Sequence, residues 1–367
     1  MNEARAAALA GLPALGLEIL REIFRQGPFL AFGLAMLLLS EGLRVFLGDT
    51  SSVPVTVRVA GFLYFLLLTL IGVFPMQFFR VAVFENARSP TRALLKSVRG
   101  FFMDDSRLLR GFITLTAIFI FISSFGALKA SITLVQPFAW DSAFDDLDRW
   151  LHFGYRPWQL LAPILNHPPV TAVIAVNYHM WFLGLTLYWL YFAFEERPGA
   201  FRTQALLAFM LTWSVGGVAL AMLFSSAGPC YFGKLGLGHD PYAELMAYLH
   251  ETSKSWPVWA VALQDSLWAN YANGSGDITK GISAMPSMHN AQCLLLVLAV
   301  WNKAPIVRNL AILHGVLVFL GSVQLGWHYA ADAYLAWIVA GLAWVASGAF
   351  ARRLEGAQSF NPAASRP

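Results

Sequence analysis

One short segment, residues 284–290 (Ala-Met-Pro-Ser-Met-His-Asn), carries side chains that could bind and act on an anion. Proline favours the first turn of a helix, so Pro286 predicts that a helix begins here. Ser287 and His289 would then lie beside backbone N–H groups that have no partner within the helix. Because such a helix N-terminus attracts negative charge, the hydroxyl and the imidazole would complete an anion site.

A second segment, residues 326–332 (Gly-Trp-His-Tyr-Ala-Ala-Asp), holds a histidine and an aspartate four residues apart. On a helix, that spacing places His328 and Asp332 on one face, about one turn apart. A carboxylate in that position could orient the imidazole and determine which ring nitrogen is free to attack.

The separation of the two segments along the chain predicts that they meet. His289 and His328 are 39 residues apart, which suits one apolar span, a tight turn at 302–305 and one span back. Both histidines then lie at the same end of adjacent antiparallel helices. A lone interfacial histidine is usually structural, but burying the Asp332 carboxylate in hydrocarbon costs about 2.5–3.5 kcal/mol. The three ionisable residues together therefore favour a functional site.

Composition requires the elements around these residues to lie in lipid. The 367 residues are 57% hydrophobic and 13% charged, whereas a soluble domain has roughly 25% charged residues. A span needs about 20 apolar residues, and eight such runs are present: about 28–47, 59–79, 111–134, 170–194, 203–224, 286–301, 306–325 and 329–350. The predicted fold class is all-α, a multi-pass helical membrane protein with about eight transmembrane helices. His179, in the fourth run, could line a cavity or form a helix–helix hydrogen bond.

The apolar runs divide the chain into three regions. Residues 1–26 predict an amphipathic surface helix, residues 27–351 a transmembrane catalytic domain, and residues 352–367 a polar tail. Within the domain, the core covers about 170–350, and the aromatic-rich outer segment 226–285 is expected to cap it.

Two further connections are long. The basic segment 80–110 is either a helix on an anionic membrane surface or a plain loop that sets topology. Apolar residues at helical spacing in the segment 135–169 predict an amphipathic helix resting at the membrane interface. Its aspartates are expected on a solvated polar face, with a carboxylate pair for acid–base work as the alternative.

Basic residues predict the orientation, because Lys and Arg concentrate in cytoplasmic loops. With a cytoplasmic N-terminus, 17 of the 25 Lys and Arg residues lie on the cytoplasmic side. An even number of spans then places both termini in the cytoplasm and the two histidines on the extracytoplasmic side, periplasmic or luminal. The net charge of +4 reflects this topology and an attraction to anionic headgroups, so no nucleic-acid partner is indicated.

Two cysteines cannot build a cysteine-type metal site, and nothing in the sequence indicates an oligomeric state.

The two segments resemble the second and third motifs of the type 2 phosphatidic acid phosphatase superfamily. The resemblance rests on Pro286-Ser287-Met288-His289 and on His328-Tyr329 followed by Asp332, and the motifs cover about residues 228–332. It implies a phosphatidic-acid-phosphatase-type helical core and a covalent phosphohistidine route that needs neither metal nor cofactor. His328 would be the nucleophile, Asp332 its orienting partner and His289 the general acid, while Ser287 would contact phosphate oxygens.

The sequence departs from the superfamily pattern where basic residues normally clamp the phosphate. The first motif, a lysine six or seven residues before an Arg-Pro pair, is missing, and Ser322 stands where the third motif has arginine. Together with residues 226–231 and 140–154, these departures resemble the inositol phosphorylceramide synthase-like subgroup. The source of positive charge is open, with Lys234 and Lys280 as candidates. Two tyrosines beside the motifs, Tyr231 and Tyr329, are further candidate substrate contacts.

The resulting hypothesis is a membrane-embedded lipid phosphotransferase or phosphatase that acts on a lipid phosphate or a phospholipid headgroup. Water as the acceptor gives a phosphatase, and an alcohol on a second molecule gives a transferase; the residues favour neither. The alternatives are a lipid transporter and an inactive scaffold. Transporters bind their substrates near the membrane midplane, whereas these ionisable residues lie at helix ends.

Overall fold

The computed structural model describes residues 16–48, 55–84, 89–195, 198–273 and 281–359, and in these ranges the regular elements are all helices. The prediction of an all-α fold is confirmed. The chain forms two compact units, one of residues 1–124 and 186–198 and the other of residues 125–185 and 199–367.

Apolar helices of membrane-spanning length identify an integral membrane protein. Among the described residues, six helices are long and apolar enough to cross a bilayer: Gly27–Phe46, Ser106–Val135, Pro168–Ala193, Ala200–Leu223, Pro305–Gln324 and Ala330–Gly356. The second and sixth predicted spans correspond to shorter apolar stretches, Val59–Pro75 and Met288–Val300. The predicted count of about eight is thus six long helices and two shorter apolar stretches.

The first unit consists of long helices and one short basic helix. Residues 16–25 are helical, and α2 (Gly27–Phe46), α3 (Val55–Phe84), α4 (Pro90–Phe102) and most of α5 (Asp105–Ala130) follow. Of the two interpretations of segment 80–110, the structure shows a helix. α4 exposes Leu95 and Phe102 and carries basic residues at positions 92, 96 and 99.

In the second unit, long helices pack closely where small residues face them. α11 (Ala200–Ser214) packs on α17 (Ala330–Ser359), and α15 (Met288–Val300) packs on both α16 (Pro305–Gln324) and α17. α11 continues through a π-helical turn at Val215–Leu220 and ends in α12 (Ala221–Leu223). A Cβ atom on Gly216 in that turn would lie 2.6 Å from the Met288 side chain, so the glycine allows the start of α15 to approach.

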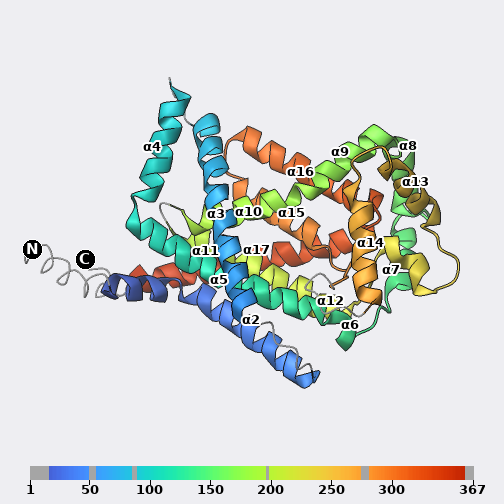
Figure 1. Ribbon diagram of the computed structural model, residues 1–367, viewed down its shortest axis with the longest axis horizontal. Coiled ribbons are helices and arrows are strands. Elements are labelled where there is room, and N and C mark those ends of the chain that lie inside the picture. The colour runs from blue at the N-terminus through green and yellow to red at the C-terminus, as the bar shows by residue number, and fades with distance from the viewer. Residues whose placement is uncertain (1–15, 49–54, 85–88, 196–197, 274–280, 360–367) are drawn as a thin grey trace, which may run out of the picture. The chain divides into compact units, whose positions relative to one another are not determined.

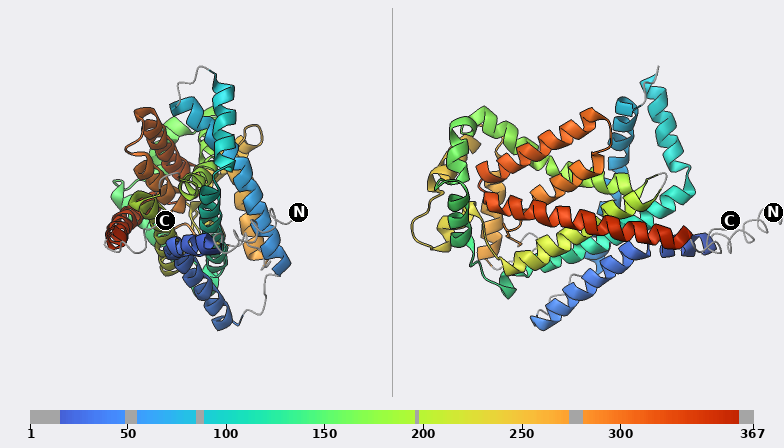
Figure 2. Two further views of the ribbon diagram at one scale, coloured as in Figure 1. Left: turned by 90° about the vertical axis from the view of Figure 1, so that its left-hand side faces the viewer. Right: turned by 180° about the vertical axis from the view of Figure 1, so that it is seen from behind.

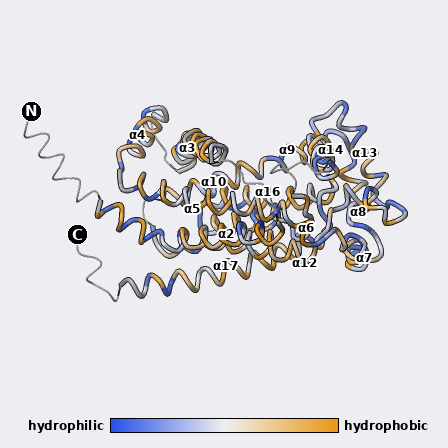
Figure 3. Tube along the Cα trace, turned by 60° about the horizontal axis from the view of Figure 1, so that its bottom comes forward, coloured by the Kyte–Doolittle hydropathy of each residue, from blue (hydrophilic) through white to orange (hydrophobic). Residues whose placement is uncertain are grey.

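Short helices gather at one end of these long helices (Figure 1; Figure 2 shows the same arrangement from behind). They are α6 (Ile132–Val135), α7 (Asp141–Leu151), α8 (Pro157–Leu165), a 3₁₀ helix at Pro229–Leu235, α13 (Ala243–Ser253) and α14 (Trp259–Ala272). α9 (Pro168–His179) begins at this end, and α10 (Trp181–Ala193) follows it along the chain (Figure 1). Figure 3 shows hydrophilic residues concentrated in these short helices and their connections, while the long helices are mostly hydrophobic. The predicted outer cap at 226–285 is therefore largely helical in its described part.

The helix α7 forms as predicted, but the expected orientation of its acidic face was wrong. Asp141, Asp145 and Asp148 are buried, with 5% or less of their surface exposed, whereas Trp150 is 77% exposed. The reason is that backbone N–H groups of other loops donate to Asp141 and Asp148, while the side chains of Arg156 and Tyr242 donate to Asp145. Three of the four aspartates therefore turn inward, and the apolar side chains of Trp150 and Leu151 are exposed.

Candidate active site

Three loop segments are tied together by backbone hydrogen bonds and form the frame of the candidate site. The amide of Ser287 donates to the carbonyl of Asp332 at 3.0 Å, so the two predicted histidine segments are in direct contact. The amide of Ala284 donates to Ser226 at 3.0 Å, and the amide of Cys230 donates to Gly326 at 2.8 Å. Because these bonds link segments that start or end long helices, the frame holds the helix ends in register.

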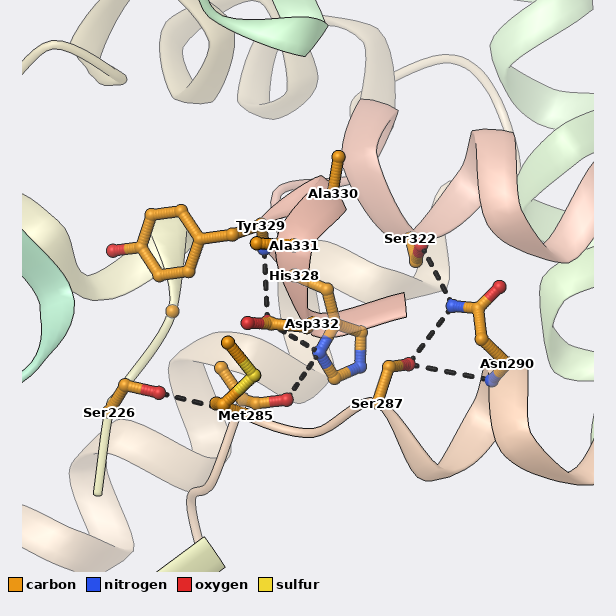
Figure 4. Close-up of polar contacts among 12 residues, drawn as sticks. Ser226, Met285, Ser287, Asn290, Ser322, His328, Tyr329, Ala330, Ala331 and Asp332 are labelled. Atoms are coloured by element: carbon orange, nitrogen blue, oxygen red, sulfur yellow. Dashed lines mark hydrogen bonds and ion pairs between the residues drawn. The ribbon is translucent and has the colours of Figure 1, made fainter. Parts of the chain in front are cut away.

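The hydrogen bonds of His328 determine its tautomer (Figure 4). Its Nδ1 lies 2.9 Å from the carbonyl oxygen of Ala284 and 3.2 Å from Oδ2 of Asp332. A carbonyl oxygen can only accept, so Nδ1 carries the proton and Nε2 keeps its lone pair. The Asp332 oxygen also accepts the amide of Tyr329 at 3.0 Å, which holds the carboxylate in place.

Burial keeps the His328 imidazole neutral. The side chain is 6% exposed, and burial is the largest cause that lowers the pKa of His328 to about 3. An imidazole with that pKa is unprotonated at neutral pH, as a nucleophile must be.

His289 lies beside His328, as the sequence predicted. The centroids of the two imidazole rings are 5.6 Å apart. The His289 ring also contacts Tyr178 and Trp181, with centroid distances of 4.7 and 4.4 Å. These aromatic contacts from α9 and α10 hold the second imidazole next to the first, where it can exchange a proton with a group bound at His328.

Ser287 caps α15 within a small polar cluster (Figure 4). Its hydroxyl oxygen accepts from the Asn290 side-chain amide at 3.0 Å, and the same amide lies 3.2 Å from the hydroxyl of Ser322. All three residues are fully buried. Ser322, at the position where the superfamily has arginine, thus pairs with a neutral amide.

The carboxylate of Asp141 anchors two of the site loops to α7. It accepts the amides of Ala227 and Gly228 at 2.9 and 2.8 Å and the hydroxyl of Tyr329 at 2.9 Å. Gly228 has a φ of 101°, a backbone conformation that glycine adopts without strain. A Cβ there would lie 2.7 Å from the carbonyl of Trp327, so the close approach of these loops also requires glycine.

Two more carboxylates of α7 hold neighbouring elements. Asp148 accepts the amides of Ala330 and Ala331 at 2.8 Å each, at the N-terminus of α17. Asp145 pairs with Arg156 at 2.7 Å and accepts the hydroxyl of Tyr242 at 2.7 Å. The hydrogen bond to Asp145 raises the pKa of Arg156. The sequence signal for this role was the spacing of the three aspartates, which places them on one face of the helix.

Asp148 gives a testable pH dependence. Burial raises its pKa to about 7 and outweighs the two amide bonds. Since this folded-state pKa lies above the ordinary value of about 3.9, the folded protein binds the proton more tightly than the unfolded chain. The contribution of Asp148 to stability is therefore present below about pH 4 and is lost as pH rises through about 7. Asp148→Asn is expected to lose this component, visible as the difference between wild-type and variant melting temperatures from pH 4 to 8 in detergent.

The matched control for that experiment is Asp146→Asn, because Asp146 lies on the exposed side of the same helix. Its melting curve is expected to follow that of the wild type at every pH. A constant offset between Asp148→Asn and wild type across the range would contradict the assignment to Asp148.

The remaining candidate substrate contacts are two tyrosines and two lysines, and the structure describes three of them. The hydroxyl of Tyr231 donates to the carbonyl of Gln264 at 3.0 Å, and that of Tyr329 donates to Asp141, so both rings are buried and engaged within the protein. Lys234 lies 3.6 Å from Asp265 and near the rings of Tyr231 and Trp268. Lys280 lies outside the described residues.

The sequence left two interpretations of His179, a cavity lining or a helix–helix hydrogen bond, and the structure bears on the second. Its Nδ1 lies 2.7 Å from the carbonyl of Ala175 in its own helix, and its ring meets Trp259 edge to face at 5.6 Å. The described hydrogen bond of His179 is therefore within its own helix, and the described contacts include no hydrogen bond from His179 to another helix.

The orienting role of Asp332 predicts a moderate loss of activity in Asp332→Asn. In a serine protease, replacing the orienting aspartate costs about 10⁴-fold because the histidine adopts the wrong tautomer. Here the Ala284 carbonyl holds the same tautomer, so the expected fall in kcat is smaller, about 10²-fold. Initial rates with Asp146→Asn as the control would measure it. Activity within twofold of wild type would show that Asp332 has no orienting or charge-stabilising role.

Comparison with known proteins identifies the family. A model of the PAP2 superfamily matches residues 142–346, which is more than half of the chain and includes α7 after Asp141, both histidine segments and Asp332. No curated protein and no solved structure matches the chain. The chain belongs to the PAP2 superfamily, whose members are generally phosphatases or phosphotransferases.

Proposed function

We propose that this protein transfers a phosphoryl-containing group from a lipid phosphate or phospholipid through a covalent intermediate on Nε2 of His328. The observation that carries the proposal is the pair of hydrogen bonds at Nδ1 of His328, to Ala284 and Asp332, which leaves Nε2 as the only basic nitrogen of that ring. The second imidazole at 5.6 Å supplies a group that can donate a proton to the leaving oxygen.

The first half of the reaction forms the intermediate. The lone pair on Nε2 of His328 attacks phosphorus, a P–N bond forms, and the bond from phosphorus to the leaving oxygen breaks. Protonated His289 gives its proton to that oxygen. The positive charge that develops on the His328 ring is stabilised by the Asp332 carboxylate at Nδ1.

The second half transfers the group to an acceptor. The acceptor hydroxyl loses its proton to His289 and attacks phosphorus, and the P–N bond breaks with its electron pair returning to Nε2. Water as the acceptor releases phosphate, and a lipid or polyol alcohol gives a new phosphate ester. His289 performs both proton transfers in this cycle, and Asp332 stabilises the charge on the His328 ring without taking a proton.

Within this activity, we assign the protein to transfer of the inositol phosphorylceramide synthase type, with lipid phosphate hydrolysis as the alternative. Support comes from the resemblance of residues 226–231 and 140–154 to that subgroup and from Ser322 at the arginine position. The excess of basic residues on the opposite loops supports an extracytoplasmic site with both termini in the cytoplasm. A lipid transporter is the less favoured function, because the ionisable residues lie at helix ends.

The experiment is a product analysis with purified protein in lipid nanodiscs. Lipid phosphates and phosphatidylinositol are offered with and without ceramide, diacylglycerol and inositol, and both free phosphate and new phospholipids are measured. A new phospholipid that requires an alcohol acceptor supports the transferase, and free phosphate without one supports the phosphatase. Lipid movement across the bilayer without either product would reject both in favour of transport.

A further inference from the structure

The described site contains histidines, hydroxyls and amides, but a phosphate also needs positive charge around its oxygens. At this end of the second unit, most described cationic side chains are already paired with carboxylates. Arg156 lies 2.7 Å from Asp145, Lys234 lies 3.6 Å from Asp265, and Arg149 lies 3.7 Å from Asp146. Lys254 pairs with Glu251 at the surface.

Lys129, at the C-terminal end of α5, differs from these residues. It is partly buried and makes no hydrogen bond or ion pair with a described residue. Its positive charge is close enough to His328 to contribute to the lowered pKa of that imidazole, and it also interacts electrostatically with His289. A lysine in an apolar span is costly without an anionic partner, and an anion bound at the two histidines would be that partner.

The path of the Lys129 side chain explains how it reaches the site. A Cβ on Gly281 would lie 2.6 Å from Cγ and 3.0 Å from Cδ of Lys129. The stem therefore passes across Gly281, a residue without a side chain, and residues 281–284 continue directly to the Ala284 carbonyl that binds His328. The same backbone segment thus positions both the lysine and the nucleophile.

We propose that the Lys129 ammonium binds the phosphate oxygens of the substrate and supplies positive charge in place of the basic residues missing from the first motif and from the Ser322 position. An ammonium on a flexible stem acts as a point charge that can follow the phosphate as its geometry changes. It also stabilises the charge on the equatorial oxygens during transfer. Lys129 precedes the family-matched residues 142–346, so this charge comes from a helix outside the matched segment. Phosphate binding by Lys129 does not depend on the proposed function, whereas its role in catalysis does.

The test measures phosphate binding and turnover separately. Inorganic phosphate is titrated against wild type, Lys129→Met, Lys129→Arg and the control Lys254→Met in detergent, and stabilisation against thermal unfolding gives the dissociation constant. Lys129→Met, which keeps the apolar stem over Gly281, is expected to weaken binding about tenfold or more, since charge-assisted hydrogen bonds are about twice as strong as neutral ones. Lys129→Arg and Lys254→Met are expected to stay within about threefold of wild type.

Gly281→Ala provides a second variant that retains the charge. The added methyl group would displace the lysine stem, so phosphate binding should weaken while the melting temperature without phosphate stays measurable. Equal phosphate binding by wild type and Lys129→Met, or no stabilisation of the wild type by phosphate, would overturn the proposal. Phosphate binding that depends on Lys129, with no turnover of any lipid, would support this inference while rejecting the catalytic function.

Discussion

His328→Asn is expected to abolish both phosphate release and group transfer, with a loss of about 10⁴-fold or more in kcat, because removing a nucleophile in a comparable covalent mechanism costs about 10⁶-fold. The asparagine amide can donate to the Ala284 carbonyl in place of Nδ1, so the bond that links the two loops is preserved. What disappears is Nε2, the atom that would form the P–N bond. The measurement is the initial rate with the preferred lipid, together with acid-labile phosphate on the protein after quenching.

The control is His167→Gln, because His167 is exposed and its described polar contact is to Pro163 in the preceding helix. Its rate should equal that of the wild type. Turnover by His328→Asn above one per cent of wild type, in protein that melts normally, would exclude His328 as the nucleophile.

His289→Gln is expected to produce a loss that depends on the leaving group. A general acid contributes about 10²–10⁴-fold when the leaving oxygen is basic, as in a lipid or polyol alcohol. With p-nitrophenyl phosphate, whose leaving group is a good one without protonation, formation of the intermediate should slow far less. Breakdown still needs His289 to take a proton from the acceptor, so the phosphorylated protein should accumulate.

The aromatic contacts of His289 provide the matched control. Trp181→Phe weakens the packing around the ring without removing its proton-transfer atoms, so it is expected to change both substrates to the same small extent. An equal loss with alcohol and nitrophenol leaving groups in His289→Gln would mean that the residue acts by packing alone.

Much of the fold could be predicted because its signals are local. Long apolar runs correspond to the long helices, and the helix predicted from Pro286 begins two residues later, at Met288, with Ser287 as its N-cap. The contact between the two histidine segments was also predictable, since a short return path between His289 and His328 leaves few alternatives. The structure adds the hydrogen bond from Ser287 to Asp332 that joins them.

The orientation of α7 could not be predicted, because the same amphipathic pattern suits a helix facing water or one facing buried donors. The donors for Asp141 and Asp148 belong to Gly228 and Ala330, far along the chain, and nothing local identifies them. Lys129 was hidden for a similar reason. Because its neighbours in the sequence are apolar, Lys129 is predicted only as part of a membrane span. The packing of α5 against Gly281, which the sequence does not indicate, brings its side chain near the histidines.

The inward acidic face of α7 has a consequence for biogenesis. Asp148 meets Ala330 and Ala331 across separations of 182 and 183 residues, and the segment that carries these amides opens the last span. During synthesis, α7 leaves the ribosome long before these two amides exist, so Asp148 lacks both donors until the start of α17 has been made. The candidate active site is therefore completed only when the last span is made, and a chain interrupted before residue 328 carries most of its apolar helices without His328 and Asp332.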